Sequence, residues 1–157
     1  MELHYDTCKS PIGVIYIVFG STGIVRLCLT KEKFGKGYNS CKKGKNEEVR
    51  KQLQKYFSGR QKKFSLPICL NGSSFQKKVW NALRSIPYGE TRSYEWLAKK
   101  IGRTKAVRAV GNAVGTNPLP IIIPCHRVIR KNGELGGYGY GPKMKEKLLE
   151  HERRHKN

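Results

Sequence analysis

The chain has 157 residues, enough for one domain or two small ones with a substantial core. It holds 32 Lys and Arg residues against 11 Asp and Glu residues, and this net charge of +21 favours a polyanionic partner, most simply nucleic acid. No apolar run approaches the ~20 residues that span a bilayer, and the start of the chain lacks a signal-peptide pattern, so we expect a cytoplasmic protein with no membrane contact.

The positive charge is spread over both halves of the chain, so no single tail accounts for it. A lysine-rich proteome would explain part of the excess without any partner. The 5 cysteines are odd in number and form no C-x-x-C pair, which argues against a disulfide framework. Zinc binding by an N-terminal set of soft ligands is an alternative, although the spacing fits no compact zinc motif: His4, Cys8, Cys28 and Cys41. We expect neither a metal nor a cofactor.

A β-hairpin is predicted near the N-terminus. Residues 12–19, I-G-V-I-Y-I-V-F, are rich in β-branched and aromatic types, a Gly-Ser-Thr-Gly turn follows, and residues 24–29 form the returning strand. Residues 31–45 are rich in Gly and Lys and show no periodicity, which predicts a loop.

One helix is predicted in this half, beginning after Asn46, which can cap it, and ending at Gly59. Its apolar residues recur at helical spacing: Val49, Leu53, Tyr56 and Phe57. Residues 64–70 predict a short strand, and residues 71–73 predict a linker. Residues 1–70 are therefore expected to form a small αβ support domain without catalytic candidates.

The second half, residues 73–157, is predicted to be mainly helical. A first helix begins at Ser74 and is broken at Pro87. Its apolar stripe consists of Phe75, Val79, Leu83 and Ile86. Ser93 caps a second helix, Y-E-W-L-A-K-K-I, which Gly102 ends. Three residues of this helix are expected to face the core: Trp96, Leu97 and Ile101.

Thr104 is expected to cap a third helix, K-A-V-R-A-V-G-N-A-V-G. One side of this helix is apolar: Val107, Val110 and Val114. The other side combines small residues with one exposed arginine: Ala106, Ala109, Ala113 and Arg108. A helix, a short Gly-containing turn and a helix form the helix-turn-helix pattern. Close packing inside the protein is the alternative use of the small residues, but with the basic charge the pattern favours DNA docking.

Residues 117–130, N-P-L-P-I-I-I-P-C-H-R-V-I-R, combine three prolines with a run of isoleucines. This predicts a buried β segment or an extended loop rather than a helix. The segment delivers Cys125 and His126, and Arg127 and Arg130 follow at once. Nearby cationic groups lower the pKa of a cysteine thiol, which favours a nucleophile here. A buried structural cysteine is the alternative.

Two further elements follow the cysteine segment. Residues 131–133 predict a turn, and residues 136–141 predict a flexible loop whose backbone N–H groups can bind a ligand. A plain surface loop is the alternative. The chain closes with a helix, M-K-E-K-L-L-E-H-E, in which Leu148 and Leu149 can pack inward and Glu152 can reach the core edge near a histidine.

The string P-C-H-R-V, with Asn117-Pro118 eight residues before the cysteine, resembles the active-site signature of the O6-alkylguanine-DNA alkyltransferases, also called methylated-DNA–protein-cysteine methyltransferases. The similarity runs from about Phe75 to Glu152. It implies an α/β fold in two parts, a ribonuclease H-like αβ domain (residues 1–70) and a mainly helical, winged-helix-like domain with the helix-turn-helix (residues 73–157). It also implies DNA repair by direct reversal, in which a methyl or other alkyl group moves irreversibly from O6 of guanine, and from O4 of thymine, to a cysteine that acts once.

The resemblance also implies catalytic roles. Cys125 is the implied alkyl acceptor, His126 the base that deprotonates it through a water, and Glu152 the carboxylate that orients this histidine. Asn117 is implied to hold the hydrogen-bond network of the site. Tyr94 is implied to hydrogen-bond N3 of a guanine that has left the base stack, so that the guanine departs neutral.

The remaining implied roles concern the base and the DNA. Pro120 and Tyr138 would wall the pocket, the carbonyls of Cys125 and Val128 would accept from the guanine amine, and the N–H of Gly139 would meet O6. Many relatives carry Ser at position 139, so only the backbone donor remains here. Arg108 would fill the stack that the flipped base vacates. The implied partner is double-stranded DNA containing O6-alkylguanine, docked by its minor groove on a monomer through positions that include Ser93, Ala106 and Ala109.

Two rival functions stay open from the residues alone. A non-enzymatic nucleic-acid-binding protein of winged-helix type shares the charge and the helix-turn-helix, but it gives no reason for Cys125, Asn117 and Glu152 to occur in this arrangement. A Cys-His hydrolase would show a burst and turnover. Adjacent Cys and His residues rarely present their side chains directly to each other, and a strongly basic exterior does not help peptide cleavage.

Overall fold

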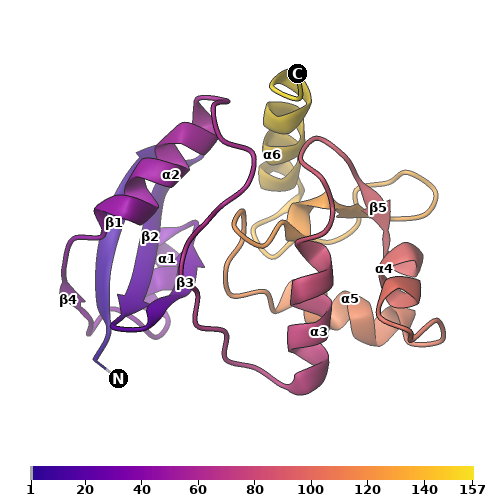
Figure 1. The fold of residues 1–157 in the computed structure, drawn as a ribbon, viewed down its shortest axis with the longest axis horizontal. Helices are drawn as coiled ribbons and strands as arrows, with labels where there is room; N and C mark the ends of the chain where they lie inside the picture. Colours follow the sequence, from indigo (N-terminus) through magenta and orange to yellow (C-terminus); the bar gives the residue numbers. More distant parts are fainter. Residues whose placement is uncertain (1) are drawn as a thin grey trace. The chain divides into compact units, whose positions relative to one another are not determined.

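A computed structural model describes residues 2–157. The chain separates into two compact units, the first ending at Leu70 and the second spanning Asn71–Asn157 (Figure 1). Within residues 2–157, every helix is too short or too polar to cross a membrane. The predicted α/β class is confirmed, since a sheet with helices builds the first unit and helices dominate the second.

A four-stranded sheet forms the centre of the first unit. Its strands lie in the order β3 (Gly23–Cys28), β2 (Gly13–Gly20), β1 (His4–Ser10) and β4 (Lys42–Lys43). The first three are antiparallel neighbours, and β4 is parallel to β1. The predicted hairpin of β2 and β3 is confirmed. The sequence did not predict β1, because H-Y-D-T-C-K-S carries few apolar residues and its pairing with β2 supplies most of the order.

Helices cover both faces of this sheet, α2 (Glu47–Phe57) on one and α1 (Lys31–Gly35) on the other (Figure 1). Asn46 caps α2 as predicted, accepting a hydrogen bond from the Val49 N–H at 3.2 Å. The loop predicted for residues 31–45 is wrong where α1 and β4 form. One helical turn is too short to show a period, and Phe34 holds it by stacking on Tyr16, with ring centroids 4.6 Å apart.

Residues 64–70 are extended but do not form the predicted regular strand. A single bridge joins Ile68 to Ile24, with hydrogen bonds from the Ile24 N–H to the Pro67 carbonyl (3.0 Å) and from the Cys69 N–H to the Ile24 carbonyl (2.8 Å). Pro67 has no N–H to extend a ladder. Gly23 lies so close that a Cβ there would stand 2.6 Å from the Pro67 oxygen.

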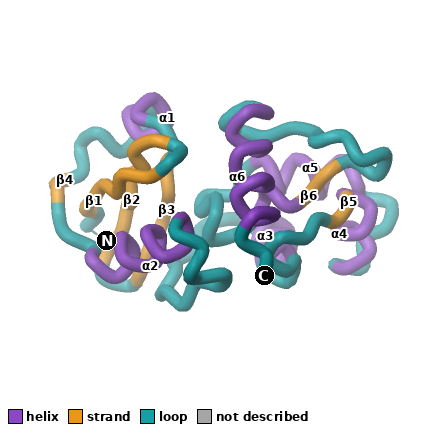
Figure 2. The backbone as a smooth tube through the Cα atoms, turned by 90° about the horizontal axis from the view of Figure 1, so that it is seen from above, coloured by secondary structure: helices purple, strands orange, loops and turns teal. Residues whose placement is uncertain are grey.

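The second unit contains α3 (Ser74–Leu83), α4 (Tyr94–Lys100), α5 (Val107–Gly115) and α6 (Pro142–Arg154). The short parallel strands β5 (Arg92–Ser93) and β6 (Val128–Ile129) lie side by side (Figure 2). A capping box of Ser73 and Gln76 begins α3, and Val79 and Leu83 are buried as predicted. Trp80 adds an anchor between helices, since its Nε1 donates to the Ala113 carbonyl at 2.9 Å.

Helices α4 and α5 form the predicted helix-turn-helix. Ser93 caps α4, accepting from the Trp96 N–H at 3.0 Å. The predicted cap at Thr104 is wrong, because α5 begins at Val107 with Ala106 at its N-cap and no side-chain cap. The assignment of Ala113 to the open side of this helix is also wrong, since it is buried at 4% exposure. The open side keeps Ala109 and Arg108, which are exposed, and Ala106, which is partly exposed.

Candidate active site

The segment that carries Cys125 is buried and tightly turned. Pro120 and Ile123 are bridged, and Asn117 closes the turn, because its Nδ2 donates to the Ile123 carbonyl at 2.7 Å and its Oδ1 accepts from the Leu119 N–H at 3.0 Å. Ile121 has a φ of +75°, a strained conformation for a β-branched residue, and its side chain is 1% exposed. The extended loop predicted for this segment is confirmed up to a short 3₁₀ helix, η1 (Cys125–Arg127).

A buried carboxylate on α6 gathers the polar groups next to the cysteine. Glu152 is 0% exposed, and its Oε2 lies 2.7 Å from Nε2 of His126. Arg127 donates to both carboxylate oxygens, from Nε at 2.8 Å and from Nη2 at 3.0 Å, and its Nη1 donates to the Ile86 carbonyl at 2.7 Å. The Gly89 N–H donates to Oε1 at 3.2 Å. The carboxylate is thus fully paired, as a buried charge must be.

This network sets the protonation of its members. Burial alone would raise the pKa of Glu152. At the acidic pH where this carboxyl titrates, the charge of protonated His126 and the hydrogen bonds and charge of Arg127 lower the pKa well below its usual range. Burial lowers the pKa of His126 despite the carboxylate beside it, so the imidazole is neutral near pH 7. Neutral His126 donates its Nε2–H to Glu152, which assigns the unprotonated lone pair to Nδ1. That atom is buried and has no hydrogen-bond partner among the described residues.

Cys125 is 7% exposed, and burial raises the pKa of its thiol. Hydrogen bonding from Asn117 and the charge of Lys145 oppose this shift. The expectation that Arg127 and Arg130 lower this pKa is wrong, because Arg127 is committed to Glu152 and the side chain of Arg130 is 63% exposed. The resting thiol is protonated and needs a base to become a nucleophile.

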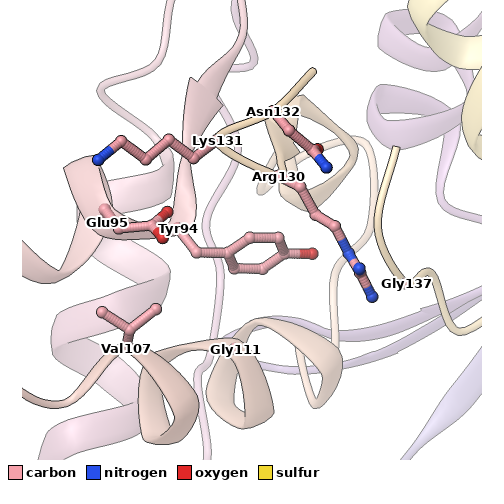
Figure 3. A pocket seen from close by; sticks show the side chains of 8 residues that line it. All are labelled: Tyr94, Glu95, Val107, Gly111, Arg130, Lys131, Asn132 and Gly137. Atoms are coloured by element: carbon pink, nitrogen blue, oxygen red, sulfur yellow. The ribbon is translucent and has the colours of Figure 1, made fainter. Parts of the chain in front are cut away.

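A pocket of about 530 Å³ opens at the end of this segment, next to Arg130. It is lined from α4, α5 and the loop after β6: Tyr94, Glu95, Val107, Gly111, Arg130, Lys131, Asn132 and Gly137. Figure 3 shows the Tyr94 ring lying across the pocket above the turn of α5 that holds Gly111, with its hydroxyl directed toward Arg130. Burial raises the pKa of Tyr94, and a thiolate at Cys125 would raise it further, so its hydroxyl keeps its proton at neutral pH.

The loop after β6 fits closely around Tyr94. Gly136 has a φ of +75°, and a Cβ there would lie 3.2 Å from the Tyr94 hydroxyl, so this position needs glycine. Tyr138 brings a buried hydroxyl that has no hydrogen-bond partner of good geometry among the described residues but lies near enough to Cys125 to affect the pKa of the thiol. Val128, directly after η1, is fully buried.

The structure brings part of the predicted site residues together near the thiol of Cys125: Asn117, Tyr94, Tyr138 and Val128. The next residue of the chain, His126, is paired with Glu152. Pro120 lies in the same buried segment, bridged to Ile123, and the contact predicted for Gly139 stays a prediction.

Other predicted residues lie on or beside the helix-turn-helix: Arg108, Ala106, Ala109 and Ser93. The hydroxyl of Ser93 accepts the capping hydrogen bond of α4. We therefore expect Ser93 to position this helix for a DNA contact.

Sequence reasoning missed two residues of the site. Arg127 was expected to act on the thiol and instead holds Glu152. Lys145 was overlooked although it is fully buried, and it shares one face of α6 with Leu148 and Glu152. A lysine three and seven residues before two buried positions was the available signal.

Among the residues that the structure describes, no three His, Cys, Asp or Glu side chains gather so as to hold a metal ion. The N-terminal set considered as zinc ligands is therefore not brought together as a site: His4, Cys8, Cys28 and Cys41.

Comparisons with known proteins agree along the whole chain. Residues 3–70 match the family described as 6-O-methylguanine DNA methyltransferase, ribonuclease-like domain, and residues 74–154 match its DNA binding domain. The chain is 44% identical to the constitutive methylated-DNA–protein-cysteine methyltransferase of Bacillus subtilis, over 96% of this chain and 95% of that protein. The corresponding protein of Methanosarcina barkeri is 45% identical, over 94% of this chain and 95% of its own.

A solved structure is similarly close. The crystal structure of Mycobacterium tuberculosis OGT in complex with DNA superposes with a TM-score of 0.90 at 40% identity, covering 97% of this chain and 94% of that one. The resemblance carried by P-C-H-R-V is thereby confirmed: the chain belongs to the 6-O-methylguanine-DNA methyltransferase family, the methylated-DNA–protein-cysteine methyltransferases.

Proposed function

We propose that this protein repairs DNA by moving a methyl or larger alkyl group from O6 of guanine to the Sγ atom of Cys125, once per molecule. The observation that carries this proposal is the hydrogen bond between His126 and Glu152 at 2.7 Å. The Nε2–H of His126 is committed to Glu152, and its Nδ1 is buried with no hydrogen-bond partner among the described residues, while the Cys125 thiol of the preceding residue is protonated. A neutral imidazole oriented by a carboxylate is the arrangement that activates a nucleophile.

The reaction is a direct displacement that needs no cofactor. Nδ1 of His126 takes the thiol proton through one water, and Glu152 stabilises the imidazolium that results. The thiolate attacks the alkyl carbon, an S–C bond forms, and the C–O6 bond breaks with its electrons leaving on the guanine. Tyr94 gives its proton to N3, so a neutral guanine departs. The same displacement at O4 of thymine yields thymine.

The residues to which the family resemblance assigns contacts with the guanine would hold the base during this step. Pro120 and Tyr138 flank it, the carbonyls of Cys125 and Val128 accept from its amine, and the N–H of Gly139 donates to O6. The absence of a side-chain hydroxyl at position 139 leaves one donor rather than two. The product is a thioether, which the groups of the pocket do not cleave, and this makes the protein a stoichiometric reagent.

DNA docking would use the open side of α5. Ala106 and Ala109 let the backbone approach the minor groove, and Arg108 occupies the gap left when the target base flips out. The net charge of +21 attracts the negatively charged duplex. We propose that a monomer acts on double-stranded DNA in the cytoplasm.

Counting the product tests this function against its rivals. An excess of duplex with one O6-methylguanine is mixed with the protein, and repaired guanine is quantified over time. We expect a plateau at one guanine per protein molecule and none for Cys125→Ala. Continued turnover would indicate a hydrolase. Binding without repair would indicate a DNA-binding protein whose Cys125 is unreactive.

A further inference from the structure

A second pocket lies in the first unit, at the β4 edge of its sheet (Figure 1). Its volume is about 410 Å³, and its walls come from β1, β4, α2 and the turn between β4 and α2. The lining residues are Asp6, Thr7, Lys43, Gly44, Lys45 and Arg50. The residues assigned to alkyl transfer all follow Leu70, so this pocket shares none of them.

The pocket carries an excess of positive charge. Three cationic side chains line it, those of Lys43, Lys45 and Arg50, against the one carboxylate of Asp6. Asp6 is only 4% exposed, so its carboxylate presents little surface to a ligand. A concave surface lined mainly by charges of one sign concentrates the electric field and attracts ions of the opposite sign. The pocket therefore favours an anion.

The fold itself makes little use of these cations. Lys43 and Lys45 are exposed, and among the described residues their side chains have no ion-pair or hydrogen-bond partner. The Nε of Arg50 lies 4.0 Å from Oδ2 of Asp6, too far for a hydrogen bond, and it is buried without a hydrogen-bond partner among the described residues. The side chain of Arg50 is 39% exposed, so much of it stays accessible to a ligand.

Hydrogen bonds hold the turn between β4 and α2 against β1. The Gly44 N–H donates to the Tyr5 carbonyl at 2.8 Å, and the Asn46 N–H donates to Oδ2 of Asp6 at 2.8 Å. Asn46 then caps α2, the helix that carries Arg50. The cations therefore stand on a backbone that is already held in place, which lowers the ordering cost of binding a ligand.

A phosphate group matches these donors. Arginine binds phosphate oxygens through its planar fork, and lysine binds them as a point charge. The hydroxyl of Thr7, whose backbone N–H alone is engaged, can donate a further hydrogen bond. A pocket of about 410 Å³ has the size of sites for whole ligands, so it admits a phosphate that belongs to a larger molecule.

We propose that the first unit binds a backbone phosphate of duplex DNA in the pocket lined by Lys43, Lys45 and Arg50. The positive charge of the chain is spread over both halves, and this site gives part of the charge in the first half a specific use. The choice of DNA as the occupant rests on the proposed function, whereas the phosphate site itself follows from the pocket.

The test compares two triple variants of the full chain that lose the same charge. The first replaces the pocket cations: Lys43→Gln, Lys45→Gln and Arg50→Gln. The second replaces three exposed lysines of the same unit that lie outside the pocket: Lys9→Gln, Lys31→Gln and Lys63→Gln. The affinity of each protein for an undamaged duplex is measured over a series of salt concentrations.

We expect the pocket variant to bind roughly tenfold more weakly, and its slope of log affinity against log salt to fall by about 1, because one phosphate contact is lost. The matched variant should lose far less affinity and keep the wild-type slope. Equal losses in the two variants would overturn the site, since they would show that only the total charge matters.

Inorganic phosphate locates the site without DNA. It is added to the wild-type protein at constant ionic strength while the amide chemical shifts are followed by NMR. We expect the largest changes at Thr7, Gly44 and Lys45, and their loss in the pocket variant. Changes no larger there than at Lys9 and Lys31 would show general screening and overturn the site. Phosphate binding without a selective loss of DNA affinity would reject DNA as the occupant.

Free O6-benzylguanine, which carries no phosphate, separates this proposal from alkyl transfer. Both triple variants should react with it at the wild-type rate. A slower reaction in the pocket variant alone would mean that its substitutions disturb the alkyl-transfer site, and would overturn the phosphate site as the cause of weaker DNA binding. Failure of the wild type to react would count against the proposed function, while undamaged DNA still decides for or against the pocket.

A double variant covers the case in which the pocket variant does not fold. Lys43→Gln with Lys45→Gln changes two exposed side chains and leaves Arg50 in place. We expect the same selective loss of DNA affinity, smaller in size. Wild-type affinity in this folded double variant would refute the site.

Discussion

Cys28 in the sheet of the first unit and Cys125 in the second are equally hidden from water but differ in their neighbours. They are 0% and 7% exposed, and burial raises the pKa of both thiols. Cys28 packs among apolar residues such as Val18 and Phe34. Cys125 is followed by His126, whose Nδ1 has no hydrogen-bond partner among the described residues and whose Nε2 is hydrogen-bonded to Glu152. Burial therefore does not distinguish a structural thiol from a reactive one; the base and its orienting carboxylate do.

Removing the carboxylate should have the largest effect. In Glu152→Ala, Arg127 loses its partner in a buried site, and we expect a loss of roughly 3–5 kcal/mol in the free energy of unfolding together with loss of alkyl transfer. Urea denaturation measures the first effect and guanine release the second. Glu150→Ala is the matched control, because its ion pair with Arg153 (2.9 Å) is exposed and should contribute at most about 1 kcal/mol. Equal losses in both variants would contradict the role of the buried network.

Removing the proton-accepting side chain of His126 should make the Cys125 thiol as unreactive as a structural cysteine such as Cys28. For His126→Gln we expect the rate with O6-benzylguanine at pH 7 to fall roughly 10²–10⁴-fold. Because the pKa of the Cys125 thiol is raised, the remaining rate should climb as the pH rises toward that pKa and solvent removes the proton. A pH–rate profile of wild type and variant measures this. A flat profile in the variant would show that thiol ionisation is not the step that His126 serves.

The DNA-docking helix should matter only when a base must leave a duplex. For Arg108→Ala we expect repair of O6-methylguanine in duplex DNA to weaken by roughly tenfold or more, while reaction with free O6-benzylguanine stays near wild type. Rates on the two substrates are compared for the same preparation. Lys105→Ala, an exposed residue just before α5, serves as a control for lost charge alone. Equal loss on both substrates would remove Arg108 from base flipping.

The smallest effect on transfer should come from the structural thiol. Cys28→Ala should leave the rate of alkyl transfer unchanged and lower the free energy of unfolding by about 1 kcal/mol, because a small buried side chain is truncated. Thermal denaturation and guanine release measure the two quantities. A slowed transfer reaction in this variant would mean that the two buried cysteines are not as separate in role as their surroundings indicate.

Local signals in the sequence predicted much of the fold. Asn46 and Ser93 cap the helices that follow them. Gly102 follows the end of α4 as predicted, with a φ of +74°. These features depend on a few neighbouring residues, so they are visible in the chain. The short helix at Phe34 and the start of α5 after Thr104 depend on tertiary packing, which local patterns do not contain.

The site residues that belong to a sequence motif could be predicted. Those that depend on contacts between distant parts of the chain could not. The string around Cys125 and the placing of Glu152 came from the resemblance to the alkyltransferases. The partner of Arg127 could not be predicted, because it lies 25 residues away on another helix. Lys145 was missed for a similar reason, since its acceptors are backbone oxygens that no side-chain pattern reveals.

The most direct test of alkyl transfer is the intact mass of the protein after mixing with a duplex that bears one O6-methylguanine, with Cys125→Ser measured alongside. The account predicts that wild type gains one methyl group, that the methyl maps to the peptide containing Cys125 and not to the peptide containing Cys28, and that the variant gains none. An unchanged wild-type mass with DNA still bound, or a methyl group on another cysteine, would contradict it.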